Sequence, residues 1–311
     1  MPEVAMIVGY PASGKSTLTR GYVTRGFISL NRDTEGGKIA SLVPKMVELI
    51  KANKNVVLDN TFATIAERKQ FIDAAKNSGA DVLCDWLTTS IEDAQFNACY
   101  RMMELKGKIL TPAEIKAEKS PNLFPPAALF SYRKRFEKPT VAEGFGLVAK
   151  RDFEREFPKN WTGKAIFLDY DGTLRDTISG AKWPTDPSDI KILPNRQEIL
   201  TEFLSKGYML LGVSNQSGVS KNNPSHEVVR ECFDKTNELL GLDIEYSYCP
   251  DNPAPVSCYC RKPMPGMAID FCYRYRLDPR KCIMVGDRTS DKTFAKRSHI
   301  GQYFDAEDFF A

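Results

Sequence analysis

Two stretches of this 311-residue chain have residue types and spacings that suit phosphate chemistry. The first, Gly9 to Ser16, reads G-x-x-x-x-G-K-S directly after the apolar segment Val4–Val8. Glycines let backbone N–H groups turn inward around phosphate oxygens, and the helix predicted from Lys15 presents its positive end to them. We therefore expect a Mg²⁺-bound nucleotide triphosphate, ATP. The residues expected to contact it are Gly9, Ser13, Gly14, Lys15, Ser16 and Thr17.

A candidate general base follows the next predicted strand, Phe27–Leu30. A kinase requires a group that accepts the proton of the attacking hydroxyl, and Asp33 has the right chemistry and place. The alternative is that Asp33 caps the following helix. Asp59 ends the third apolar run and supplies a second carboxylate. The alternative is that Asp59 only helps to form the turn there. Arg32 and Asp59 are therefore predicted to bind the acceptor substrate.

Basic residues follow the fourth predicted strand at Arg101, Lys106 and Lys108. Such groups can close over a triphosphate as a lid and neutralise the charge that develops during transfer. The alternative is a solvated helix face.

The second phosphate-type stretch is an apolar run that ends in D-x-D-G-T at Asp169 and Asp171. Two carboxylates at a strand end can divide the work, one attacking phosphorus and the other moving the proton of the leaving oxygen. Ser214 and Asn215 offer donors to a phosphoryl group, and Lys262 offers a cation. Asp287 and Asp291 add oxygen ligands of the kind that Mg²⁺ prefers.

Strands must alternate with helices to place these groups. The first half predicts strands at 4–8, 27–30, 56–58 and 82–86, with helices at 15–22, 35–52, 65–77 and 91–104. The second half predicts strands at 165–169, 208–214, 244–248 and 282–285. This alternation indicates an α/β protein with parallel sheets, whose ligands bind beyond the carboxyl ends of the strands. We predict two domains, residues 1–155 and 156–311, joined by a charged linker at 150–164.

Composition narrows the classes of protein. Charged residues make up 27% of the chain, the net charge is +3, and no apolar run approaches the ~20 residues of a membrane span. The N-terminal residues lack the features of a secretory signal, so we expect an intracellular protein with reduced thiols and no membrane association.

The first half resembles the 5′-hydroxyl polynucleotide kinases in the stretches GYPASGKST, LNRDT, VVLDNT and YRMMELKGK. The resemblance implies that Asp33 is the general base for a 5′-hydroxyl. It also implies that Arg101 and Lys106 belong to the lid, although lysine lacks the bidentate fork of arginine.

The second half resembles the haloacid dehalogenase superfamily of phosphatases, with a Rossmann-like fold. The resemblance makes Asp169 the nucleophile and Asp171 the general acid–base, with Ser214 and Lys262 on the phosphate. The Mg²⁺ ligands it implies are Asp169, Asp171, Asp287 and Asp291. Within the superfamily the motifs resemble the histidinol-phosphate and heptose-bisphosphate phosphatases and share much with the DNA-repair 3′-phosphatases.

That phosphatase branch has a zinc loop of the form C-x-H…C-x-C. The present chain has Cys249, Asp251, Cys258 and Cys260 at the matching places, so an aspartate stands where histidine is usual. Three thiolates and a carboxylate suit Zn²⁺. The alternative is a proline-rich loop of reduced cysteines.

A kinase followed by a phosphatase resembles the bacteriophage-type polynucleotide kinase-phosphatases. The resemblance implies repair of DNA or RNA ends, in which a 5′-hydroxyl gains a phosphate and a 3′-phosphate is removed, leaving the ends that a ligase joins. One alternative is a small-molecule kinase fused to a sugar-phosphate or histidinol-phosphate phosphatase. The other is a nucleic-acid-binding protein without activity, against which Lys15, Asp33, Asp169 and Asp171 argue.

Overall fold

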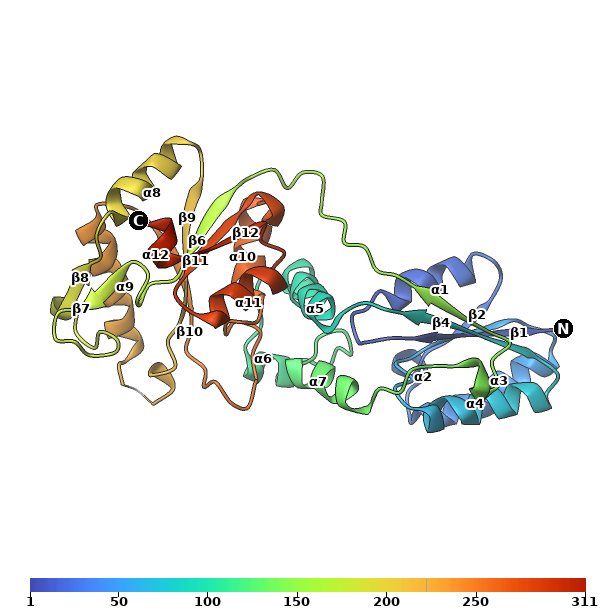
Figure 1. Cartoon of the computed structure of the whole chain (residues 1–311). Helices are drawn as coiled ribbons and strands as arrows, with labels where there is room; N and C mark the ends of the chain where they lie inside the picture. The colour runs from blue at the N-terminus through green and yellow to red at the C-terminus, as the bar shows by residue number, and fades with distance from the viewer. Residues whose placement is uncertain (222) are drawn as a thin grey trace. The chain divides into compact units, whose positions relative to one another are not determined.

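The computed structural model describes residues 1–221 and 223–311 (Figure 1). The chain divides into two compact units. The first comprises Met1–Asn97 and Ser120–Arg155, and the second comprises Ala98–Lys119 and Glu156–Ala311. No helix within the described residues has both the length and the apolar character needed to cross a membrane.

The first unit contains a parallel sheet of five strands in the order β2-β3-β1-β4-β5. Alternate residues of β1 pack on opposite faces. Met6 contacts the cluster formed with α3 and α4, whereas Ile7 contacts the cluster that includes Tyr22 of α1. The elements are β1 (Glu3–Val8), α1 (Lys15–Val23), β2 (Ile28–Leu30), α2 (Arg32–Glu35), α3 (Leu42–Lys51), β3 (Val56–Asp59), α4 (Ile65–Asn77), β4 (Asp81–Leu87), α7 (Pro126–Arg135) and β5 (Leu147–Arg151).

The second unit contains another parallel sheet of five strands, in the order β10-β9-β6-β11-β12. Phe167 of β6 packs with α10 and α11, and Leu168 packs with α8 and α9 on the other face. A short antiparallel pair, β7 (Arg175–Thr177) and β8 (Ile190–Ile192), follows β6. The other elements are α6 (Pro112–Ala117), β6 (Ala165–Leu168), α8 (Arg196–Ser205), β9 (Met209–Asn215), α9 (His226–Leu240), β10 (Glu245–Cys249), α10 (Gly266–Tyr275), β11 (Ile283–Gly286), α11 (Thr289–Arg297), β12 (Gln302–Asp305) and α12 (Ala306–Phe309).

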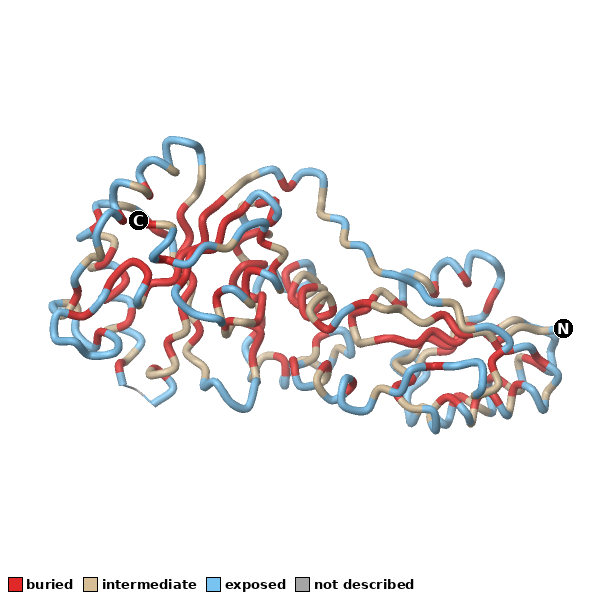
Figure 2. The backbone as a smooth tube through the Cα atoms, in the orientation of Figure 1, coloured by how far each residue is buried: buried red, intermediate tan, exposed pale blue. Residues whose placement is uncertain are grey.

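The predicted fold class is confirmed, because both sheets are parallel and have helices on both faces. Most residues of the central strands of each sheet are buried (Figure 2). Strands of this kind are apolar on both faces, which is why they read as continuous hydrophobic runs in the sequence.

Two predicted elements were wrong. The helix predicted at 35–52 begins only at Leu42, because Gly36 and Gly37 have φ of 74° and 78° and interrupt it. Lys150 and Arg151 belong to β5 and not to a linker. β5 is an edge strand with exposed charged side chains, so its hydrophobic signal is weak.

Candidate active sites

The loop between β1 and α1 has the backbone of a phosphate-binding turn. Ala12 and Gly14 both have positive φ, at 59° and 96°, and α1 begins at Lys15. At Gly9 a Cβ atom would lie 2.7 Å from the Ser13 hydroxyl, so the turn excludes a larger residue there. The sequence therefore folds Gly9–Gly14 into a tight loop at the start of a helix, where backbone N–H groups attract anions.

The side chains of this loop fit a nucleotide triphosphate. The Lys15 ammonium donates to the carbonyls of Gly9, at 3.2 Å, and Tyr10, at 2.6 Å. Ser13 is buried, and its hydroxyl has no hydrogen-bond partner. Ser16 and Thr17 are exposed in the first turn of α1. A lysine folded onto its own loop and an orphaned buried hydroxyl are both groups that phosphate oxygens would satisfy.

Two side chains hold the loop from outside, and the sequence alone had not indicated them. Thr89 donates its hydroxyl proton to the Ser13 carbonyl at 2.9 Å, and Asn97 donates to the Ala12 carbonyl at 2.8 Å. Asn97 lies on α5 (Ile91–Lys106) and accepts a hydrogen bond from Arg155 at 2.9 Å. The loop conformation is therefore fixed by β4–α5 as well as by its own glycine.

Asp33 lies in the first turn of α2, at the carboxyl end of β2, with its side chain 39% exposed. Asn31, not Asp33, caps the helix, because the Asn31 side chain accepts from the Asp33 N–H at 2.7 Å. The alternative of a capping role for Asp33 is therefore wrong. Asp33 forms an ion pair of 3.0 Å with Arg32, and Asp59 is buried at the end of neighbouring β3.

The two predicted lid residues lie in the part of α5 that belongs to the second unit. Lys106 forms an ion pair of 2.5 Å with Glu118. Arg101 is half-buried, and that burial lowers its pKa. Their contact with a nucleotide stays a prediction.

In the second unit, Asp169 and Asp171 follow β6 directly, as predicted. Asp169 is buried, and loss of solvent raises its pKa to about 6 although the Lys262 ammonium opposes the shift. Lys262 lies 2.8 Å from Asp169 and 2.7 Å from Asp291. Gly172 directly follows Asp171 and has φ of 84°. A Cβ atom at this position would lie 2.5 Å from the Asp287 carboxylate.

Asp171 is positioned by Arg175, which the sequence had not indicated, and by Gln216, which completes the donor stretch that begins with the predicted Ser214 and Asn215. Arg175 donates to one carboxylate oxygen and Gln216 to the other, each at 2.9 Å. Gln216 also donates to the Ser214 hydroxyl at 2.9 Å. Gln216 directly follows the predicted Ser214 and Asn215. Its place next to them is the feature of the sequence that indicates a role at this site. The two donors orient Asp171 toward the cavity it shares with Asp169.

Asn215 and Lys262 form a reciprocal pair. The Asn215 amide donates to the Lys262 carbonyl at 3.0 Å and accepts from the Lys262 N–H at 2.9 Å. The end of β9 thereby fixes the segment that carries the cation. The structure brings together the predicted phosphate-binding residues Ser214, Asn215 and Lys262 with Asp169 and Asp171 around one cavity.

A set of three carboxylates fits a hard divalent cation. Ligand oxygens of Asp169, Asp287 and Asp291 lie within 4.8 Å of one another. Burial raises the pKa of Asp287, with the charge of Asp169 adding to the effect. Mutual repulsion of this kind is relieved by a cation such as Mg²⁺, which prefers oxygen ligands.

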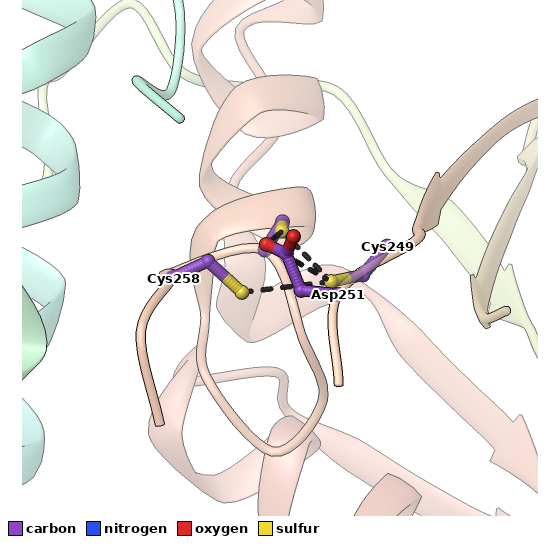
Figure 3. A group of neighbouring side chains, drawn as sticks. Cys249, Asp251 and Cys258 are labelled. Carbon is purple, nitrogen blue, oxygen red and sulfur yellow. Dashed lines mark hydrogen bonds between the residues drawn. The ribbon is translucent and has the colours of Figure 1, made fainter. Parts of the chain in front are cut away.

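Near this site in the chain lies the cysteine cluster, formed by Cys249, Asp251, Cys258 and Cys260. Figure 3 labels Cys249, Asp251 and Cys258 of this cluster. The Cys249 sulfur lies 2.9 Å from that of Cys260 and 3.5 Å from that of Cys258. The Asp251 carboxylate lies 3.8 Å from the Cys260 sulfur. The four ligand atoms lie within 4.8 Å of one another, which fits the donor set of a four-coordinate Zn²⁺.

The family comparisons assign each half. Residues 164–311 match the model of the polynucleotide kinase 3 phosphatases, and residues 4–101 match an AAA domain model. A probable D-glycero-D-manno-heptose-1,7-bisphosphate 7-phosphatase of Thermoplasma volcanium is 33% identical over 139 residues, which are 43% of this chain and 92% of that protein. The chain belongs to the branch of the haloacid dehalogenase phosphatases that includes these heptose-bisphosphate phosphatases. Its first unit is a P-loop kinase-type domain.

A bifunctional polynucleotide phosphatase/kinase of Schizosaccharomyces pombe is 33% identical over 162 residues. The match covers 51% of this chain and only 36% of the yeast protein. The chain therefore spans about a third of the length of that relative. Among solved structures, a D,D-heptose 1,7-bisphosphate phosphatase from B. bronchiseptica, complexed with magnesium and phosphate, is 25% identical with a TM-score of 0.39. The match covers 44% of this chain and 76% of the B. bronchiseptica chain.

Proposed function

We propose that the chain heals nucleic-acid ends, phosphorylating a 5′-hydroxyl with ATP and removing a 3′-phosphate. The observation that carries the proposal is the P-loop domain joined to a phosphatase domain that matches the polynucleotide family. A heptose-bisphosphate phosphatase is matched over 92% of its length by only 43% of this chain, so the P-loop domain is an addition to that phosphatase. The products, a 5′-phosphate and a 3′-hydroxyl, are the substrates of a ligase.

In the kinase reaction, Lys15 and the loop N–H groups bind the β- and γ-phosphates, with Ser16 available to ligate Mg²⁺. Asp33 accepts the proton of the 5′-hydroxyl as its oxygen bonds to the γ-phosphorus and ADP leaves. Arg32 and Asp59 bind the acceptor end, and Arg101 and Lys106 close over the phosphates.

In the phosphatase reaction, an oxygen of ionised Asp169 bonds to phosphorus while the bond to the 3′-oxygen breaks and Asp171 gives that oxygen its proton. Asp171 then takes a proton from the water that hydrolyses the phosphoaspartate. Ser214, Asn215 and Lys262 hold the phosphoryl oxygens. Bound Mg²⁺ would supply positive charge to them, held by Asp169, Asp287 and Asp291.

We also propose that the cysteine cluster holds one Zn²⁺. One hydrogen bond and one short stretch of chain connect it to the phosphatase site. The Cys249 carbonyl accepts from the Gln216 N–H at 2.8 Å, and Cys260 stands two residues before Lys262. A metal there would fix both segments.

One experiment separates this function from its alternative. An oligonucleotide with a 5′-hydroxyl and a 3′-phosphate is incubated with γ-labelled ATP, beside a panel that includes heptose bisphosphate and histidinol phosphate. Label at the 5′ end and phosphate release from the 3′ end support end healing. Turnover of a sugar phosphate with an untouched oligonucleotide would instead establish a small-molecule kinase fused to a sugar-phosphate phosphatase, which the Thermoplasma relative favours.

A further inference from the structure

The catalytic cavity of the phosphatase unit is too small for a nucleoside. It is lined by Asp169, Asp171, Ser214, Lys262 and Arg288 and has about 20 Å³ of open space. That is close to what one water molecule needs, so the cavity admits part of a phosphoryl group and little else. The rest of the substrate must bind outside it.

A larger pocket of about 460 Å³ adjoins this cavity. Arg288 lines both spaces. Asp287 lines the larger pocket, and its carboxylate lies within 4.8 Å of that of Asp169. Pockets of about 300–1,000 Å³ are typical of small-molecule sites. The pocket is therefore adjacent to the reacting phosphorus and large enough for the group that bears it.

Two cationic side chains, Arg288 and Lys292, line this pocket. Arg288 is 51% exposed and lies 3.7 Å from Asp287. Lys292, one helical turn later on α11, is exposed and forms no ion pair among the described residues. Exposed cations next to a phosphate site suit a second phosphate of the same substrate.

The pocket is also lined by an aromatic ring. Phe304 lies on β12, the edge strand of the sheet, and is 37% exposed. Phe309 packs behind it with 5.6 Å between ring centroids. Tyr303 is fixed by donating its hydroxyl proton to the Gly286 carbonyl at 3.0 Å. A supported, exposed ring beside cations is the combination that binds single-stranded nucleic acid by base stacking.

From these observations we propose that the pocket of Arg288, Lys292 and Phe304 binds the nucleotide that carries the 3′-phosphate. Arg288 and Lys292 contact its 5′-side phosphodiester, and Phe304 stacks on its base. Asp305 and Asp308 line the same pocket and offer acceptors to sugar hydroxyls or base amino groups. A sugar bisphosphate would use the cations but has no aromatic base to stack on Phe304. The proposal rests on the proposed 3′-phosphatase function.

The test compares two substrates in steady-state kinetics with the full chain and Mg²⁺. One is a 3′-phosphorylated oligonucleotide, and the other is p-nitrophenyl phosphate, which has no phosphodiester, no sugar and no base. Lys292→Ala and Phe304→Ala are each expected to raise KM for the oligonucleotide about tenfold, with kcat and p-nitrophenyl phosphate turnover unchanged. Lys292→Ala should also lower the slope of log KM against log salt by about 1. The controls are Lys296→Ala, on the same helix outside the pocket, and Trp183→Ala, an exposed aromatic elsewhere.

Unchanged oligonucleotide KM in both variants, with active wild type, would overturn the pocket assignment and leave the end-healing function standing. A wild type that hydrolyses p-nitrophenyl phosphate but no oligonucleotide would overturn the function itself. If Lys292→Ala then raised KM for heptose bisphosphate while Phe304→Ala did not, the pocket would be a second-phosphate site for a small sugar, which contradicts the nucleotide assignment.

Discussion

The key aspartates of the two units both stand just beyond a parallel strand, yet water has very different access to them. The side chain of Asp33 is 39% exposed and pairs with an exposed arginine. That of Asp169 is 8% exposed and pairs with Lys262, which is 2% exposed. Water therefore reaches the Asp33 carboxylate in the first unit, whereas the fold of the second unit largely excludes water from the Asp169 carboxylate. The kinase-type site is thus shaped mainly by backbone, and the phosphatase site by buried charge.

The buried site should show the largest single effect. Asp169→Asn removes the nucleophile while keeping its size, so 3′-phosphate release should fall by at least about 10³-fold. Phosphorylation of 5′-hydroxyl ends should stay within about twofold, because the phosphate-binding loop and Asp33 belong to the other unit. Both activities are measured on one doubly modified oligonucleotide, and thermal melting checks folding. Loss of both activities in a folded variant would mean a shared site.

At the exposed site, Asp33→Asn removes the proton acceptor and should lower the kinase rate about 10²–10⁴-fold. KM for ATP should not change, because the loop around Lys15 binds the donor. Single-turnover phosphorylation of an oligonucleotide measures the rate, with Glu35→Gln on the same short helix as control. A near-normal rate would move the role of base to Asp59.

The cysteine cluster should show a smaller effect. The protein purified without chelators is expected to contain one zinc per chain by mass spectrometry, and Cys258→Ser should lose it, with phosphatase activity reduced about tenfold. Cys84→Ser, a buried thiol of the first unit, is the control. Because a carboxylate is a harder ligand than imidazole, Asp251→His should bind zinc more tightly. Metal-free protein with full activity would exclude the site.

The smallest effect is expected behind the phosphate-binding loop. Asn97→Ala removes the hydrogen bond to the Ala12 carbonyl, so KM for ATP should rise about fivefold, the equivalent of one ordinary hydrogen bond. Phosphatase activity should not change. Asn77→Ala, an exposed residue near the end of α4, provides the matched control. An unchanged KM would show that the loop keeps its conformation without Asn97.

The residues that sequence reasoning found share a local signal. Gly9–Ser16 and Asp287 with Asp291 lie at strand-to-helix junctions, and Asp169 with Asp171 lie in the short turn between β6 and β7, so spacing along the chain fixes their spacing in space. The residues it did not assign act across long sequence separations. Asn97 reaches a loop 85 residues earlier, and Gln216 reaches an aspartate 45 residues earlier. Polar side chains of this kind have no pattern of their own in the sequence.

The amino-acid sequence by itself determined that the protein is α/β, that it carries a P-loop and a D-x-D phosphatase motif, and which apolar runs become central strands. Apolar runs must be buried, and parallel pairing is the way to bury them on both faces. Only the tertiary structure decided that residues 98–119 pack with the second unit, where the Tyr100 ring lies 5.8 Å from Trp161. It also decided that Lys262 lies between Asp169 and Asp291. Such neighbours depend on how distant strands and helices pack together, because no short-range rule links residue 169 to residue 262.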